Sequence, residues 1–164
     1  MMAVKMNVVR IDKKQGQQIV FGMGNFSIKT VDDVYRACLD AVPGIKVGVA
    51  FNEAAPKLTR YTCNDEVLGL AAARNLVSIG AGHAFLVLIE NAFPINILNE
   101  IKKVAGTCTI MAASANEMEV IVGETDLGRA VLGVVDGNCV NQIETETERV
   151  ERRELVKKLG YTLG

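Results

Sequence analysis

The sequence predicts an α/β protein, a single domain over residues 1–164 in which a layered sheet of mixed parallel and antiparallel strands packs with helices. Strand-like and helix-like segments alternate along the chain, which is the pattern of layered α/β folds. Residues 84–89 are continuously apolar, as expected of a strand covered on both faces. With 164 residues and 49% apolar content, the chain can fill one hydrophobic core.

The N-terminal part of the chain predicts two strands followed by a helix. Residues 4–12 and 18–24 are rich in β-formers and flank a short polar turn, so we expect them to form a hairpin. Thr30, followed by Asp33 at the third position after it, resembles a capping box with a short acid, and apolar residues then recur at helical spacing. The dipeptide Pro43-Gly44 is expected to end this helix.

The middle of the chain predicts two short strands and a second helix. The strands cover residues 46–51 and 58–62, separated by a polar segment that breaks regular structure. Asn64 is expected to cap the helix, and Asp65 lies in its first turn, where the helix dipole favours an acid. Gly80 is the expected C-terminal stop.

The C-terminal part predicts one central strand, a helix, three further strands and a charged tail. Residues 84–91 form the central strand, and Pro94 suits the first turn of a helix through Val104. Residues 144–153 are heavily charged, and only a narrow apolar stripe follows, so the tail is expected to be a surface element or a subunit contact. The three further strands are expected at residues 107–113, 119–123 and 129–135.

Composition and charge disfavour several classes of protein. The formal net charge of −1 gives little attraction to a phosphate backbone, so no nucleic-acid partner is expected. The apolar run at 84–89 is far shorter than the roughly 20 residues that span a bilayer, and the N-terminus does not resemble a secretory signal. We therefore expect a cytoplasmic protein that does not enter a membrane. Widely spaced cysteines favour reduced structural thiols over a metal or redox site: Cys38, Cys63, Cys108 and Cys139.

His83 is the strongest candidate for a catalytic residue. It is the only histidine, and imidazole is the side chain whose ordinary pKa lies nearest neutrality. Gly80 and Gly82 flank it in Gly-Ala-Gly-His, which would let backbone N–H groups approach a bound phosphate. The same glycines are equally well explained by a helix stop and a tight turn into the next strand.

Polar residues at expected strand ends are the remaining site candidates. Arg60 or Lys57 could hold a phosphate, whereas Asn64 and Asp65 could bond a ribose or a ring nitrogen; turn formation and helix capping are the alternative roles. Arg129 opens an apolar strand and could hold an anion or form a structural ion pair. No P-loop, dinucleotide-binding glycine motif or nucleophile elbow is present.

Several of these segments, taken in order, resemble the adenosine-specific kinase family. The matching segments are Phe51-Asn52-Glu53-Ala54, Arg60, Asn64-Asp65, Ile79-Gly80-Ala81-Gly82-His83, Pro94-Ile95-Asn96-Ile97-Leu98-Asn99, Ser114-Ala115-Asn116 and the stretch from Gly128-Arg129 to Asp136-Gly137. The chain departs from the family pattern at Glu117, where a proline is usual, and at Ala130-Val131, where Gly-Ile is usual.

The resemblance implies a compact α/β protein that binds adenosine or AMP and carries a phosphoryl group on a histidine, for which His83 is the matching position. It also implies a symmetric homo-oligomer, with a trimer as the expected state and sites close to subunit boundaries. The substrate-binding residues it implies are Asn52, Glu53, Arg60, Asn64, Asp65, Gly80, Gly82, Asn96, Asn116 and Arg129.

The leading hypothesis is phosphoryl transfer through a phosphohistidine at His83, with adenosine or AMP as the ligand. Positioning and charge stabilisation dominate this chemistry, so nearby cations would offset charge on the phosphoryl oxygens. No protein-bound metal is expected; Mg²⁺ accompanying a nucleotide phosphate donor, held in part by Glu53 or Asp65, is the one cofactor considered. The alternatives are a non-catalytic adenine-nucleotide-binding or sensor module and a structural oligomer without a small-molecule site.

Overall fold

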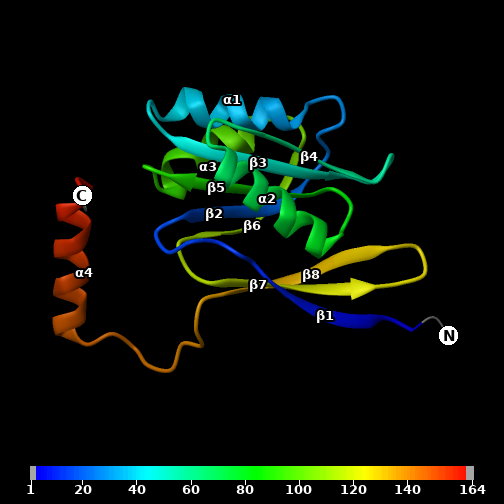
Figure 1. The fold of residues 1–164 in the computed structure, drawn as a ribbon. Coiled ribbons are helices and arrows are strands. Elements are labelled where there is room, and N and C mark those ends of the chain that lie inside the picture. Colours follow the sequence, from blue (N-terminus) through cyan, green and yellow to red (C-terminus); the bar gives the residue numbers. More distant parts are fainter. Residues whose placement is uncertain (1–2, 162–164) are drawn as a thin grey trace.

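The computed structural model describes residues 3–161, which form four helices and eight strands in one layered arrangement (Figure 1). In chain order the elements are β1 (Lys5–Arg10), β2 (Gln18–Gly24), α1 (Val31–Ala41), β3 (Lys46–Glu53), β4 (Leu58–Cys63), α2 (Glu66–Ile79), β5 (Ala84–Glu90), α3 (Pro94–Lys103), β6 (Thr107–Ser114), β7 (Met118–Glu124), β8 (Arg129–Asp136) and α4 (Glu146–Lys158).

A five-stranded sheet in the order β4-β3-β5-β2-β6 forms the centre of the fold. Its middle strand is β5, whose residues from Ala84 to Ile89 are fully buried, which confirms the central strand predicted from the apolar run. One face packs against α1 and α3, and the other packs against α2 and against a second sheet. Burial on both faces explains why this segment contains no polar side chain before Glu90.

The second sheet has three strands in the order β1-β7-β8 and lies below the five-stranded sheet in Figure 1. Its inward side chains, among them Val120 and Val122, join the core cluster that contains Leu86 and Leu88 of the central strand. No helix within residues 3–161 is long and apolar enough to cross a membrane.

The α/β class and the layered packing are confirmed, but the expected parallel pairs do not occur, because every strand pair in the described residues is antiparallel. The helices α1, α2 and α3 do connect strands that run in the same direction. In each case one antiparallel strand lies between the two: β5 between β2 and β3, β3 between β4 and β5, and β2 between β5 and β6. The alternation of helices and strands therefore correctly predicted that helices connect strands running in the same direction, but it wrongly predicted that these strands pair with each other.

The predicted opening hairpin is also wrong. β1 pairs with β7, whereas β2 pairs with β5 and β6, so the segment between them crosses from one sheet to the other. Asn75 of α2 fixes the crossing: its side chain accepts the Asp12 N–H at 2.8 Å and donates to the Asp12 carbonyl at 2.7 Å. A side-chain clamp more than sixty positions away could not be read from local turn chemistry.

The predicted helix ends agree with the structure except at one cap. Asp33 accepts the Thr30 N–H at 2.7 Å at the start of α1, and Gly80 ends α2 in the left-handed conformation with φ 66°. The N-cap of α2 is Asp65, whose carboxylate accepts the N–H groups of Val67 and Leu68; Asn64 instead bonds the backbone of β3. The strands β6, β7 and β8 match their predicted ranges within one residue at each end.

All four cysteines are free thiols; Cys38 is buried, Cys63 is half-buried, and Cys108 and Cys139 are exposed. Burial raises the pKa of the Cys38 thiol to about 12, so this cysteine remains protonated and acts as a small core residue.

Gly48 of β3 is expected to tolerate no side chain, because a Cβ there would lie 2.3 Å from the Leu68 carbonyl carbon and 2.4 Å from the Gly69 nitrogen of α2. Both atoms belong to a helix backbone that cannot rotate away. We expect Gly48→Ala to lower the free energy of unfolding by about 3 kcal/mol, measured by denaturant titration. Gly128→Ala, where a Cβ meets nothing within 4 Å, is the matched control, and equal losses in the two variants would contradict this account.

Candidate active site

His83 lies in a tight turn between α2 and the start of β5. Its φ of 63° places it in the left-handed region, its N–H donates to the Asn52 carbonyl at 2.8 Å, and its carbonyl accepts the Gly24 N–H at 2.9 Å. The backbone of His83 is thus fixed by β3 on one side and by β2 on the other. The side chain is partly exposed.

The imidazole rests against an aromatic cluster on the face of the sheet covered by α1 and α3. The ring centroids of His83 and Phe51 are 5.7 Å apart with an interplanar angle of 39°. Phe26 packs edge-on against both Phe51 and Phe85, at 5.3 Å in each pair. Phe51 is not among the site residues predicted from the sequence, because it lies in a strand that is buried continuously from Val47 to Asn52 and resembles an ordinary core residue there.

The side chain of Asn52 connects the His83 turn to neighbouring elements. Its side-chain amide donates to the carbonyls of Leu76 and Ala81, both at 2.9 Å, while its carbonyl oxygen accepts the Thr59 hydroxyl at 2.7 Å. Only 7% of the residue is exposed. In this structure its polar atoms are engaged within the chain, so what Asn52 does here is to join β3, the end of α2 and the His83 turn.

The two glycines of the turn have close neighbours within the chain. A Cβ at Gly80 would lie 3.1 Å from Nη1 of Arg129, and a Cβ at Gly82 would lie 3.1 Å from the Cβ of Ala54. Together with the left-handed φ of Gly80, these approaches show that the helix stop and the tight turn are real. The turn geometry neither requires nor opposes a bound phosphate.

Two arginines predicted to bind substrate lie near the turn, each in an ion pair. Arg60 donates to Glu53 at 2.8 Å; it is paired with Phe51 across the strands, and its side chain therefore lies on the same face as Phe51. Arg129 donates to Glu124 at 2.9 Å and to the Ser78 carbonyl at 3.3 Å, at the C-terminal end of α2 on the other face. Half of the Arg60 side chain is exposed, which leaves guanidinium donors available to a ligand.

The other predicted site residues lie at the end of the five-stranded sheet opposite to the His83 turn. Strand registers establish this, because the starts of β2 and β3 pair with the end of β5, and the end of β6 pairs with the start of β2. Each has a partner there: Asn64 binds the backbone of Ile45 and Val47, Asp65 caps α2, Asn96 bonds Phe93 N–H and Tyr161, and Asn116 donates to Asp136. The backbone N–H of Leu68 is the main cause that holds the pKa of Asp65 below its ordinary value.

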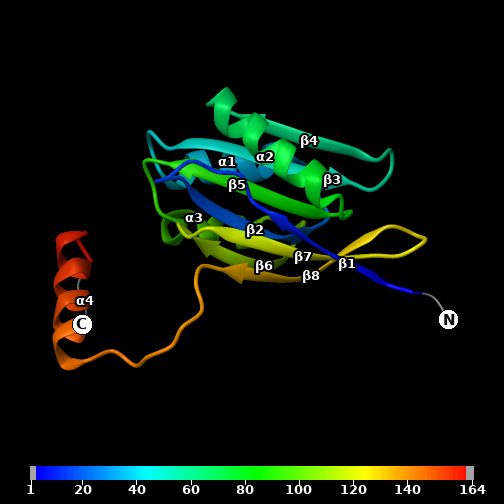
Figure 2. The same ribbon diagram turned by 60° about the horizontal axis from the view of Figure 1, so that its bottom comes forward.

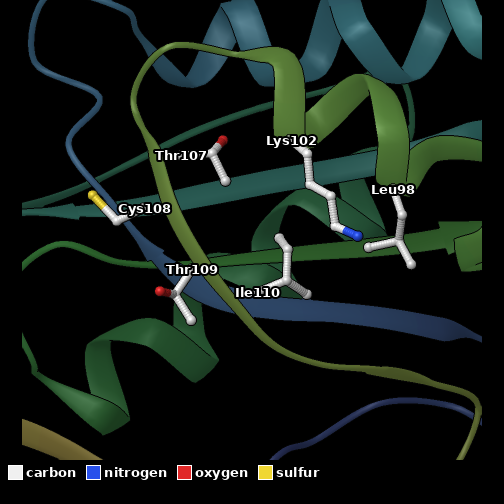
Figure 3. A pocket seen from close by; sticks show the side chains of 6 residues that line it. All are labelled: Leu98, Lys102, Thr107, Cys108, Thr109 and Ile110. Atoms are coloured by element: carbon white, nitrogen blue, oxygen red, sulfur yellow. The ribbon is translucent and has the colours of Figure 1, made fainter.

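Two surface hollows are lined by other residues. One, of about 420 Å³, lies between α3 and the edge strand β6, with Leu98 and Lys102 coming from the helix and residues 107–110 from the strand (Figure 3). The second, of about 690 Å³, lies beside Asn116 at the far end of the sheet and includes Lys13 and Glu117. His83 lines neither hollow.

The acidic residues considered for Mg²⁺ do not form a common site. Glu53 is paired with Arg60 near the His83 turn, whereas Asp65 is paired with Lys46 at the opposite end of the sheet. Within residues 3–161, no group of three or more histidine, cysteine or acidic side chains is placed to hold a metal ion. An Mg²⁺ that enters on a nucleotide could therefore contact Glu53 or Asp65 but not both.

The fold and the turn together define a small α/β protein with antiparallel sheets, which presents one imidazole, packed on an aromatic ring, at the entrance of its central strand. The family described as adenosine specific kinase matches residues 9–162. The chain therefore belongs to the adenosine-specific kinase family.

Among solved structures, the chain is similar to the PH1918 protein from Pyrococcus horikoshii OT3, a crystal structure with 56% sequence identity and a TM-score of 0.94. The match covers 99% of this chain and 100% of that chain. A search of curated proteins gives no match.

Proposed function

We propose that this protein binds adenosine or AMP and transfers a phosphoryl group through a phosphohistidine at His83. The observation that carries the proposal is the geometry of this one imidazole: partly exposed, packed on Phe51, and fixed by backbone hydrogen bonds to two strands. A nucleophile held in this way does not have to be ordered again in each reaction cycle. Membership of the adenosine-specific kinase family supports the choice of ligand.

The reaction has two balanced steps. A ring nitrogen of neutral His83 attacks the terminal phosphorus of a nucleoside triphosphate, a new N–P bond forms, and the P–O bond to the departing nucleoside diphosphate breaks. A hydroxyl of bound adenosine then attacks the same phosphorus: a P–O bond forms, the N–P bond breaks, the imidazole leaves with its electron pair, and the hydroxyl proton passes to solvent. Any Mg²⁺ enters bound to the nucleotide phosphates.

The test is incubation of the purified protein with γ-labelled nucleoside triphosphate and adenosine, with Mg²⁺ present. We expect label in AMP and, without adenosine, in an acid-labile adduct on the protein. Calorimetric titration with adenosine, AMP and guanosine is expected to show binding of the two adenine compounds only. Failure to label either the protein or AMP across several donors would reject the transfer step.

A non-catalytic adenine-nucleotide sensor is the second candidate, and one observation favours it. Arg60 and Arg129, the arginines near the turn, are already paired with Glu53 and Glu124, so the charge available to a transferring phosphoryl group is partly neutralised. Adenosine-dependent stabilisation without turnover would support this candidate. The predicted trimer, cytoplasmic location, single-domain organisation and absence of nucleic-acid partners remain predictions.

Arg60→Ala is expected to weaken AMP binding about tenfold while adenosine binding changes little. Arg60 lies on the His83 face and has exposed donors, and a charge-assisted bond to a phosphate is worth about 1.4 kcal/mol after competition from Glu53. Arg129→Ala is the matched control, because its guanidinium lies on the other face against Ser78, so both ligands should be affected equally. Calorimetric titration of each variant with AMP and with adenosine measures both affinities. If Arg60→Ala lost affinity for the two ligands equally, Arg60 would have no contact with the phosphate.

A further inference from the structure

Glu53 ends β3 on the face of the sheet against which the His83 imidazole packs. Phe51, whose ring centroid lies 5.7 Å from that of His83, precedes Glu53 by two positions, and alternate residues of a strand point to the same side. Between them, the Asn52 carbonyl accepts the His83 N–H at 2.8 Å. Figures 1 and 2 show the hairpin of β3 and β4 and the turn from α2 into β5 at the same end of the sheet. Glu53 is therefore a carboxylate that lies beside the His83 turn.

One oxygen of the Glu53 carboxylate is engaged and the other is available. Arg60 Nε donates to Oε2 at 2.8 Å, whereas Oε1 accepts no hydrogen bond from residues 3–161. The two residues are diagonal neighbours across the strands, because Arg60 pairs with Phe51 and Leu58 pairs with Glu53. The Glu53 side chain is only 20% exposed. The ion pair thus orients the carboxylate, and Oε1 keeps the lone pairs that can take up a proton.

The His83 imidazole and the Glu53 carboxylate are not bonded to each other. The ring of His83 packs on Phe51 and makes no hydrogen bond within the described part of the chain. In the transfer step an acceptor hydroxyl must approach the phosphorus held on the imidazole and lose its proton, so a base is needed on the side from which the hydroxyl arrives. Of the acids named above, Glu53 is the one on this face, since Glu124 pairs with Arg129 on the other face and Asp65 lies at the opposite end of the sheet.

We propose that Glu53 is the general base of phosphoryl transfer from His83 to adenosine. Oε1 takes the proton of the adenosine hydroxyl as the hydroxyl oxygen attacks phosphorus: a P–O bond forms, the N–P bond breaks, and the imidazole leaves with the electron pair. The protonated carboxyl group then releases the proton to solvent when AMP departs. This role rests on the proposed function and concerns its second step alone, because the attack of His83 on the phosphoryl donor removes no hydroxyl proton.

Single-turnover transfer from the isolated phosphoprotein tests this role. The full-length wild type and Glu53→Gln are labelled with γ-labelled nucleoside triphosphate, freed of nucleotide and mixed with adenosine. We expect Glu53→Gln to form AMP at least about a hundredfold more slowly, a usual loss for a general base, while its labelling at His83 changes less than about threefold. Glutamine is chosen because its carbonyl oxygen can still accept the Arg60 N–H. The matched control is Glu124→Gln, which removes the acid paired with Arg129 on the other face and should leave both rates unchanged.

Rescue by formate separates proton transfer from a structural role. Glu53→Ala leaves space beside the imidazole, and formate there should restore AMP formation in proportion to its concentration, whereas chloride at equal ionic strength should not. A side chain required only for folding or for binding adenosine gives no such response, so absence of rescue would overturn the role. Wild-type transfer in Glu53→Gln, or an equal loss of labelling and transfer, would also overturn it and leave the proposed function standing. A wild type that acquires no acid-labile label rejects the proposed function and the role of Glu53 together.

Discussion

Replacing His83 by asparagine is expected to abolish phosphoryl transfer to adenosine, with a loss of at least about a thousandfold in turnover, because removal of a covalent nucleophile leaves only the contribution of binding. Asparagine is the appropriate substitute because His83 has φ 63°, and asparagine adopts this left-handed conformation more readily than other residues with a side chain. The backbone hydrogen bonds to Asn52 and Gly24 should therefore survive, and adenosine binding should change by less than about threefold, a difference of only ~0.7 kcal/mol.

The experiment compares the wild type, His83→Asn and His83→Ala for labelled AMP formation, for acid-labile label on the protein, and for adenosine affinity. Since the chain contains one histidine, loss of the acid-labile adduct in both variants assigns the adduct to this residue. Equal turnover in wild type and His83→Asn would remove the nucleophile from the mechanism. Loss of adenosine binding together with activity would show that the imidazole binds the ligand and would favour the sensor.

The fold was predictable from the sequence as far as local chemistry determines it. The apolar run at 84–89, the Thr30–Asp33 cap and the stop at Gly80 each depend on neighbouring residues only, and each was predicted correctly. Strand order depends on contacts between distant segments. Nothing local to residues 12–17 shows that Asn75 binds the Asp12 backbone and directs β1 to β7 instead of to β2.

The candidate site shows the same division. His83 and its glycines could be found from residue type and spacing, but the ring of Phe51 beneath the imidazole could not, since it depends on the register between β3 and β5. Polar residues were assigned to a ligand because loops at strand ends commonly bind ligands. The structure places the amide of Asn52 against two backbone carbonyls, contacts that sequence alone could not reveal.

Asn52→Asp is expected to lower the free energy of unfolding by about 4 kcal/mol and to impair the His83 site as well. The substitution removes the N–H donor and directs a carboxylate at the carbonyls of Leu76 and Ala81, in a position only 7% exposed. For a chain of this length, each 1 kcal/mol corresponds to a change of about 2–4 °C in Tm, so the loss is easily measured by thermal denaturation. The His83 turn should become less ordered, because Ala81 belongs to this turn and its carbonyl accepts a hydrogen bond from the Asn52 amide.

Asn75→Asp separates the effect on the site from the effect on stability. Asn75 is 4% exposed, and its amide likewise donates to two backbone carbonyls, those of Asp12 and Ala71, neither of which belongs to the His83 turn. Both variants should therefore lose similar stability, whereas only Asn52→Asp should raise the KM for adenosine and lower kcat at a temperature where both proteins are folded. If the two variants lost activity equally, Asn52 would have no specific part in positioning His83, and the activity loss would reflect general loosening of the domain.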